Sequence, residues 1–378
     1  MQASVRRAAR ACLAAAMLLG LGAAAVPVAS AATTQSGARA RLAPHAQPAT
    51  VTEAAAAGAG WIARDLSASG ALVDAVSGKP SAGDTADAIL ALVAAGEGAS
   101  QVKAATHWLE HHFSSYVSAK GVDSPGALGL VMLAAVAAGA DPAHFGGRAT
   151  SNDLVARLRA IERLNGAAAG VFGPTSSVNA FGQSLALLAL VSVKGSAMAI
   201  RLGEAYLVRR QCADGGWEYS LSTPCAKPDP KTYSGPDTNS TALAVMAIVA
   251  AAGHFAHSPV AFFAKSQEAN GSFGYYGVSG DGQRGDADST GEVVQALIAL
   301  RAINDNQLVR DAVTPERALE NYQYRCNAPA SERGEFSYYG APNQYATLQA
   351  VPAVAGETLP IRPRKLSAAE FSFSCSAG

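Results

Sequence analysis

Six segments of the chain repeat one pattern, in which polar residues precede a run of small and aliphatic residues. The last apolar residues of these runs fall 41 to 58 positions apart, which is the length of one helical hairpin with its loops. The recurrence therefore predicts six helical hairpins. The six segments are 84–92, 124–133, 181–190, 239–248, 288–297 and 344–351.

Each repeated run is apolar on nearly every side, and a helix of that kind is buried. The segments between the runs are more amphipathic. In residues 152–164, for example, Arg157 and Arg163 keep one side polar, and residues 104–113 and 198–210 are similar. Each unit is thus predicted as a half-exposed outer helix followed by a buried inner helix. Six such units predict an all-α fold, an α6/α6 toroid with parallel inner helices.

The ends of the chain differ from this repeat. Residues 1–31 combine three early arginines, an apolar run over 13–26 and a final Ala-Ser-Ala, which predicts a secretory signal peptide and a secreted protein. Residues 32–50 lack a period and predict a flexible leader. We expect the toroid over 51–360 and a C-terminal tail over 361–378, with no transmembrane segment in the mature chain.

The charge balance excludes one class of partner. The chain has 29 basic and 29 acidic residues, and neither kind is concentrated enough to indicate nucleic-acid binding.

Four cysteines remain after the signal peptide, and an even number in an exported protein favours disulfides. Three pairings are open. We favour Cys212 with Cys225, which closes a short loop, and Cys326 with Cys375, which ties the tail to the last hairpin. A metal site is not predicted, because no cysteine lies beside a histidine and no Cys-x-x-Cys pair occurs.

The loops that lead to the inner helices share a second signature. Residues 211–217 read Gln-x3-Gly-Gly-Trp, and residues 267–275 and 323–338 carry related Gln, Gly and aromatic positions. Glycine permits a sharp turn out of the outer helix, the aromatic residue packs between units, and glutamine can cap a helix end.

These loops and the runs that follow resemble the prenyltransferase and squalene-oxidase repeat. That repeat builds the α/α toroid of the terpenoid cyclase and protein prenyltransferase superfamily. Residues 237–248 look most like the repeats of the cobalamin carriers intrinsic factor and transcobalamin, and residues 345–356 look like the close of their helical barrel. The resemblance implies an α/α toroid and makes a corrinoid one candidate ligand.

Acidic residues precede or open several inner helices, which would gather them at one mouth of the ring. One interpretation is helix capping, and the other is a ligand rim or a carboxylate pair for acid–base chemistry. The segment 286–290 resembles the Asp-x-Asp-Asp-Thr of squalene cyclases, with Ser289 in place of the third acid. In that family the middle acid donates the proton, and it would match Asp288. Asp286 and Asp288 are the catalytic candidates.

Aromatic residues recur in the last three loops, often as pairs. Packing explains one aromatic residue per loop, whereas a second could line the mouth and stack on a ligand. We therefore predict a ligand site made of Asp84, Asp237, Trp217, Tyr219, Phe273, Tyr275, Tyr276, Tyr338 and Tyr339.

His107 and His111 have a spacing that a metal ion accepts, one helical turn apart. We interpret them as the polar face of an outer helix, since no third ligand is evident from the sequence.

Three functions fit these observations. The first is a secreted protein that binds a bulky small molecule at the barrel mouth, with a corrinoid as the candidate. The second is a non-catalytic cell-envelope module that binds another envelope protein. The third is a terpene-cyclase-like enzyme that uses Asp286 and Asp288. Because the sequence offers no nucleophile–His–acid set, it favours the first, a non-catalytic role without any other cofactor.

Overall fold

The computed structural model describes residues 52–229, 234–276, 285–367 and 375. The predicted signal peptide, the leader and most of the predicted tail lie outside the described residues. The α-helices of the described ranges are α3 (Glu53–Asp65), α4 (Ala82–Ala95), α5 (Ala99–His112), α6 (Ser114–Val117), α7 (Pro125–Ala137), α8 (Leu154–Ala160), α9 (Ala180–Ser192), α10 (Ala197–Arg209), α11 (Thr238–Ala250), α12 (Pro259–Ser266), α13 (Ala287–Leu300), α14 (Pro315–Glu320) and α15 (Gln344–Val354).

Strands are few and short in these ranges. They form three antiparallel two-stranded hairpins, and each hairpin directly precedes an inner helix. The strands are β1 (Leu72–Val73) with β2 (Pro80–Ser81), β3 (Ser118–Ala119) with β4 (Val122–Asp123), and β5 (Ser337–Tyr338) with β6 (Ala341–Pro342).

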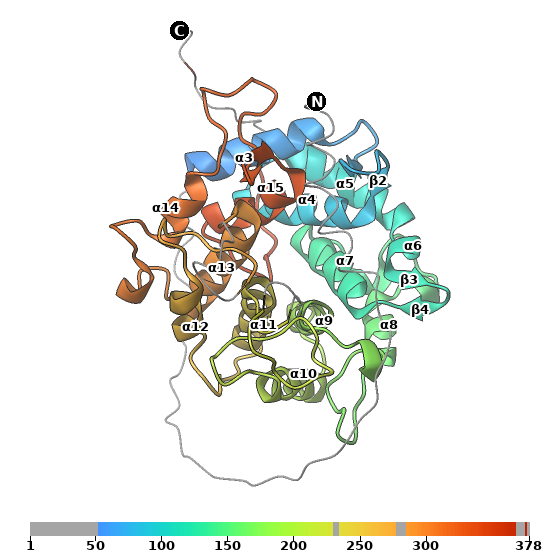
Figure 1. Ribbon diagram of the computed structural model, residues 1–378. Helices are drawn as coiled ribbons and strands as arrows, with labels where there is room; N and C mark the ends of the chain where they lie inside the picture. The colour runs from blue at the N-terminus through green and yellow to red at the C-terminus, as the bar shows by residue number, and fades with distance from the viewer. Residues whose placement is uncertain (1–51, 230–233, 277–284, 368–374, 376–378) are drawn as a thin grey trace. The chain divides into compact units, whose positions relative to one another are not determined.

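Six helices pack in a closed ring, in the order α4, α7, α9, α11, α13 and α15, and α15 packs back on α4 (Figure 1). They are the six repeated apolar runs. The helices α3, α5, α8, α10, α12 and α14 alternate with them along the chain and pack against them. The ring closes where the Thr52 hydroxyl donates to the Val354 carbonyl at 2.7 Å. The predicted α6/α6 toroid is confirmed.

Every inner helix begins with a side-chain cap. The cap oxygen accepts the N–H of the residue three positions later, which satisfies one of the free donors at the helix start. This explains why a polar residue precedes each run. The six caps are Ser81, Ser124, Asn179, Asp237, Asp286 and Asn343.

A second contact joins the preceding loop to five of the six inner helices, all but α7. Four residues after the cap, a buried threonine hydroxyl accepts a backbone N–H from the loop before the helix, and Gln183 does the same in α9. A buried N–H without a partner would be costly, so this threonine fixes the loop. The pairs are Thr85 with Leu72, Thr241 with Trp217, Thr290 with Phe273 and Thr347 with Phe336, at 2.9–3.0 Å.

The glutamine of the loop signature joins neighbouring units. The Gln267 amide donates to the carbonyls of Gly271 and Leu308, and that of Gln323 donates to the carbonyls of Gly334 and Ala54. Gly334 has a φ of +96°, and a Cβ there would lie 2.2 Å from the Ala57 carbonyl oxygen. Glycine is therefore required at that turn.

Both predicted disulfides, Cys212–Cys225 and Cys326–Cys375, are present. No helix in the described ranges has the length and apolar character needed to cross a bilayer. The two disulfides are consistent with an extracytoplasmic protein.

Candidate active site at the amino ends of the inner helices

Carboxyl groups from three inner helices meet at the amino ends of the ring. We call this set the acidic cluster. Its members raise one another's pKa by charge repulsion, in addition to the larger effect of burial, so they lie within electrostatic reach of one another. The acidic cluster comprises Asp84 and Asp87 of α4, Asp237 at the cap of α11, and Asp286, Asp288 and Glu292 at the start of α13.

Asp286 and Asp288 have different surroundings although they are two residues apart. Asp286 caps α13, accepting the Ser289 N–H at 2.8 Å and the Ser289 hydroxyl at 3.3 Å. Asp288 is 3% exposed, and its Oδ1 has no hydrogen-bond partner. Burial raises the pKa of Asp288 well above its ordinary range, and the charges of Asp286 and Glu292 add to this. Burial and these neighbouring charges therefore favour the protonated form of Asp288.

Glu292 lies one helical turn after Asp288, on the same side of α13. It is 4% exposed, and its Oε2 also lacks a partner. Burial raises its pKa to about 8. Gly291 allows α13 to come close to α15, since a Cβ there would lie 2.9 Å from the Gln349 carbonyl oxygen.

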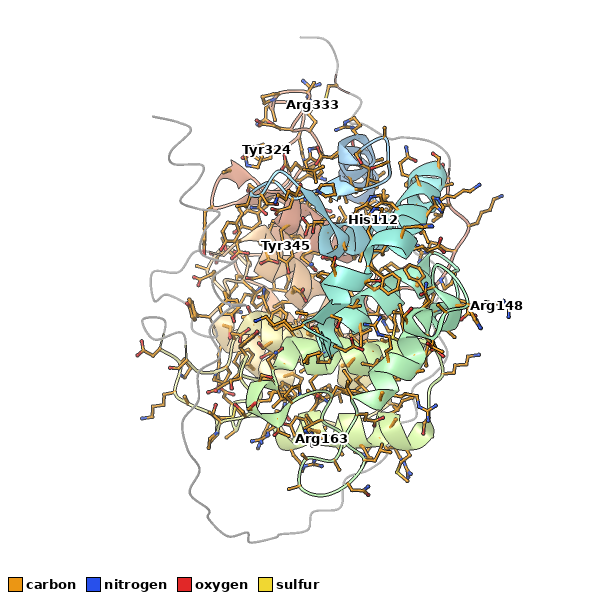
Figure 2. All side chains as sticks on the ribbon, turned by 90° about the vertical axis from the view of Figure 1, so that its right-hand side faces the viewer. His112, Arg148, Arg163, Tyr324, Arg333 and Tyr345 are labelled. Carbon is orange, nitrogen blue, oxygen red and sulfur yellow. A yellow bond between two sulfur atoms is a disulfide. The ribbon has the colours of Figure 1, made fainter. Side chains whose placement is uncertain are left out.

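Helices α15 and α4 follow α13 around the ring and supply the adjoining side of the acidic cluster. The Gln344 amide of α15 donates to Asp84 Oδ2 at 3.1 Å. Burial raises the pKa of Tyr345 of α15 (Figure 2) well above its ordinary value, and the charges of Asp288 and Asp87 add to this. Asp87 and Tyr345 keep some exposed surface although they belong to inner helices. That surface faces the interior or the mouth of the ring, because the outer helices cover the outside.

Asp237 is buried at the cap of α11, where it accepts the Ser240 N–H at 2.7 Å and a hydrogen bond from the Tyr275 hydroxyl. Burial raises the pKa of Asp237 to about 7. Asn239, two residues later, occupies the place that Asp288 has in α13, and it hydrogen-bonds the Asp288 side chain.

Tyrosines surround these acids. Tyr338 and Tyr339 of the β5–β6 hairpin have ring centroids 4.4 Å apart and lie close enough to Asp286 for its charge to raise the pKa of both phenols, after the larger effect of burial. Tyr219 packs against Phe181, with ring centroids 5.7 Å apart. The four tyrosines, Tyr219, Tyr275, Tyr338 and Tyr339, border the acidic cluster.

The α9 side of the ring is apolar. Phe181 and Leu185 lie one turn apart on α9, and both are half-buried in an otherwise buried helix. Glycines make room beside them, since a Cβ on Gly126 of α7 would lie 3.1 Å from the Gly182 Cα. The amino ends of the inner helices thus combine an acidic side and an apolar side.

Three predicted ligand residues are not brought to this surface. Trp217 and Phe273 are fully buried, and the Trp217 indole N–H donates to the Leu207 carbonyl at 2.8 Å. Tyr276 is buried beside Tyr275. These aromatic residues pack between units, which is the role expected of one aromatic residue per loop. The other predicted residues, Asp84, Asp237, Tyr219, Tyr275, Tyr338 and Tyr339, do meet around the acidic cluster.

Asp87, Glu292 and Tyr345 were missed by the sequence analysis. The inner helices were expected to be apolar on nearly every side, yet Asp87 and Glu292 are charged residues within the repeated runs. Burying an acid in a helix costs folding free energy, and buried acids of this kind often mark functional sites. That signal could have identified both residues.

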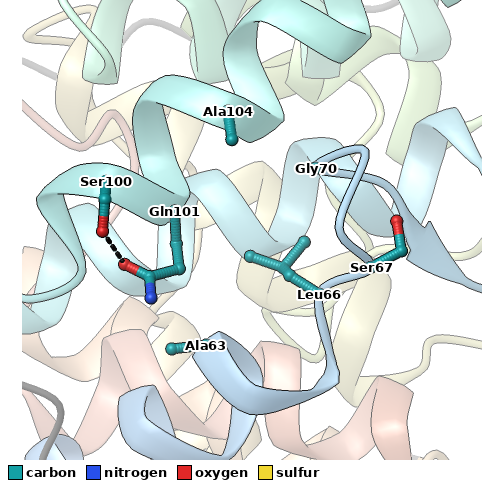
Figure 3. Close-up of a pocket in the computed structure, with 7 residues that line it drawn as sticks. All are labelled: Ala63, Leu66, Ser67, Gly70, Ser100, Gln101 and Ala104. Carbon is teal, nitrogen blue, oxygen red and sulfur yellow. Dashed lines mark hydrogen bonds between the residues drawn. The ribbon is translucent and has the colours of Figure 1, made fainter.

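A separate hollow lies outside the ring, between α3 and α5 (Figure 3). Ala63 and Leu66 of α3 and its following turn face Gln101 and Ala104 of α5 there, together with Gly70. It contains no titratable side chain and lies apart from the acidic cluster.

No family model and no curated protein matches the sequence. Solved structures do match. The type II terpene cyclase MstE from Scytonema, without ligand, is 13% identical with a TM-score of 0.51, covering 81% of this chain and 98% of that one. The fold is the terpenoid-cyclase-like α/α toroid. A variant of that cyclase in complex with geranylgeranyl dihydroxybenzoate, its substrate, is also 13% identical with a TM-score of 0.50, covering 81% of this chain and 96% of that one.

A third structure is described as a novel alpha-amylase from Clostridium perfringens. It is 11% identical with a TM-score of 0.54, covering 82% of this chain and 99% of that one. Because these neighbours are enzymes, they contradict the preferred expectation of a non-catalytic protein that binds a corrinoid.

Proposed function

We propose that this protein is a Brønsted-acid enzyme of the type II terpene cyclase kind, with Asp288 as the proton donor. The observation that carries the proposal is the buried Asp288 carboxyl with an unpartnered Oδ1. A carboxyl that stays protonated at neutral pH and has a free oxygen can deliver its proton to a substrate.

The reaction would begin when the Asp288 proton adds to one carbon of a neutral carbon–carbon double bond, leaving a cation on the other carbon. A second double bond of the same chain would attack that cation and close a ring. Loss of a proton to water or to a nearby carboxylate would end the reaction, and solvent would return a proton to Asp288. Protons balance over the cycle, and no oxidant is needed.

The surroundings of Asp288 suit such a substrate. The apolar α9 side, with Phe181 and Leu185, offers a surface for a hydrocarbon chain. The rings of Tyr275, Tyr338 and Tyr339 can stabilise a developing cation through their faces.

We also propose that the enzyme acts after export. This rests on the predicted signal peptide of residues 1–31, together with the two disulfides.

The test is to incubate the mature protein in D₂O with neutral polyprenyl compounds, including a geranylgeranyl-substituted phenol, and to analyse products by mass spectrometry. We expect cyclic products that carry one deuterium on carbon. Asp288→Asn should lower the rate by about 10²–10⁴-fold. Asp286→Asn is the matched control, because asparagine still caps a helix.

Equal loss in both variants would assign the effect to folding rather than to a proton donor. Full activity in Asp288→Asn would refute the proposal.

A further inference from the structure

Three metal-ligating side chains meet on the outer helix α5, far along the chain from the acidic cluster. His107, Glu110 and His111 each offer a ligand atom, and these atoms lie within 4.8 Å of one another. In the part of the chain that the structure describes, no other set of three such side chains is as close. The sequence showed two imidazoles one turn apart, and the structure adds Glu110 as the third ligand.

One hydrogen bond of the His111 ring leaves its Nε2 available to a metal ion. Its Nδ1 lies 2.8 Å from the His107 carbonyl oxygen. A carbonyl oxygen can only accept, so Nδ1 carries the proton and Nε2 keeps its lone pair free. In metal-binding histidines the N–H of the second ring nitrogen commonly donates a hydrogen bond to a backbone carbonyl in this way, which fixes the tautomer and the ring orientation.

The other two ligands are close to the required geometry. His107 Nδ1 lies 3.7 Å from Glu110 Oε2, and the His107 and His111 ring centroids are 4.7 Å apart. Ligand atoms around a tetrahedral zinc ion lie about 3.3 Å apart, given bonds of about 2.0–2.1 Å. Metal binding would therefore need a rotation of the His107 side chain, which is exposed and can move.

We propose that His107, Glu110 and His111 form a binding site for a borderline divalent metal ion, of which Zn²⁺ is the representative. Two neutral imidazoles and one carboxylate are typical ligands of such an ion. Three protein ligands leave a coordination position for water. The site is independent of the proposed cyclase chemistry, because none of its residues touches the acidic cluster.

Calorimetric titration of chelator-treated mature protein with ZnCl₂ tests this proposal. We expect one ion per chain, and binding at least roughly tenfold weaker in His107→Ala and in His111→Ala. His112→Ala is the matched control. It is the next residue on the same helix, but its ring stacks on Trp108 with centroids 4.3 Å apart and lies outside the set.

Circular dichroism should show equal helix content in all three variants. Unchanged Zn²⁺ binding in the His107→Ala/His111→Ala double variant, equal weakening in His112→Ala, or no binding by the wild type would each overturn the proposal. Asp288→Asn should bind Zn²⁺ like the wild type, so failure of the cyclase proposal would leave this result intact.

Discussion

Asp288 and Glu292 lie one turn apart on α13, and each has a buried carboxyl oxygen without a hydrogen-bond partner. Two such groups cannot both ionise cheaply in a buried site, so they hold protons at pH values where exposed acids have lost them. A carboxyl that served only as a helix cap would accept a backbone N–H, and the two unpartnered oxygens are the basis of the proposed proton donor.

The pH dependence of stability should reveal Glu292. Its folded-state pKa of about 8 lies above the ordinary value of 4.5, so between these values the folded protein holds a proton that the unfolded chain has released. The stability from this group is therefore complete below about pH 4.5 and is lost as the pH rises through about 8. Glu292→Gln should be more stable than the wild type at pH 8, by on the order of 1 kcal/mol or more.

Urea unfolding at pH 5 and at pH 8 measures this difference. The variant and the wild type should differ much less at pH 5, and an advantage of equal size at both pH values would contradict the assignment to Glu292.

Asp286 and Asp288 should have opposite effects on stability and catalysis. Asp286→Ala removes the cap of α13 and should cost about 0.5–2 kcal/mol. Asp288→Asn removes a buried acid without removing a cap, so the melting temperature at neutral pH should stay the same or rise. Thermal unfolding of both variants decides this, and a large loss of stability in Asp288→Asn would mean that Asp288 serves the fold.

The loop contact of the last unit can be tested at Thr347, away from the acids of α13. Its hydroxyl accepts the Phe336 N–H at 2.9 Å, and both residues are fully buried. Thr347→Val leaves that N–H without a partner and should cost about 1–3 kcal/mol. Thr347→Ser keeps the hydroxyl and should recover most of the loss in a chemical unfolding experiment. A Thr347→Ser variant that is as unstable as Thr347→Val would contradict the assignment to the hydroxyl.

The Cys212–Cys225 disulfide closes a loop between α10 and α11. Replacing both cysteines by alanine should destabilise the protein by about 2–4 kcal/mol, since the unfolded chain loses a constraint. Peptide mapping of the unreduced wild type should yield 212 linked to 225 and 326 linked to 375. A peptide that links Cys212 or Cys225 to Cys326 or Cys375 would contradict this pairing.

The fold was predictable because its signals are local and repeated. Caps and apolar runs recur six times and the Gln–Gly–aromatic loop recurs three times, so each copy supports the others. The site was harder to predict, because Asp286 and Asp288 look alike in a sequence. Only the structure shows that Asp286 accepts a hydrogen bond from the Ser289 N–H, while Asp288 Oδ1 has no hydrogen-bond partner.

The aromatic residues show the same limit. Trp217 and Tyr219 stand two positions apart in one loop, but the first is in the core and the second borders the acids. Which of them faces the mouth depends on the path of the loop over the helix ends, and no spacing in the sequence records that path.

The most direct measurement is the infrared spectrum of the mature protein at pH 7, in the region where protonated carboxyl groups absorb. We predict a band with more than one component, because burial also raises the pKa of Glu292, to about 8. One component should be lost in Asp288→Asn and retained in Asp286→Asn. A wild-type spectrum without that band, or a band that Asp288→Asn leaves unchanged, would show that Asp288 is ionised and cannot be the proton donor.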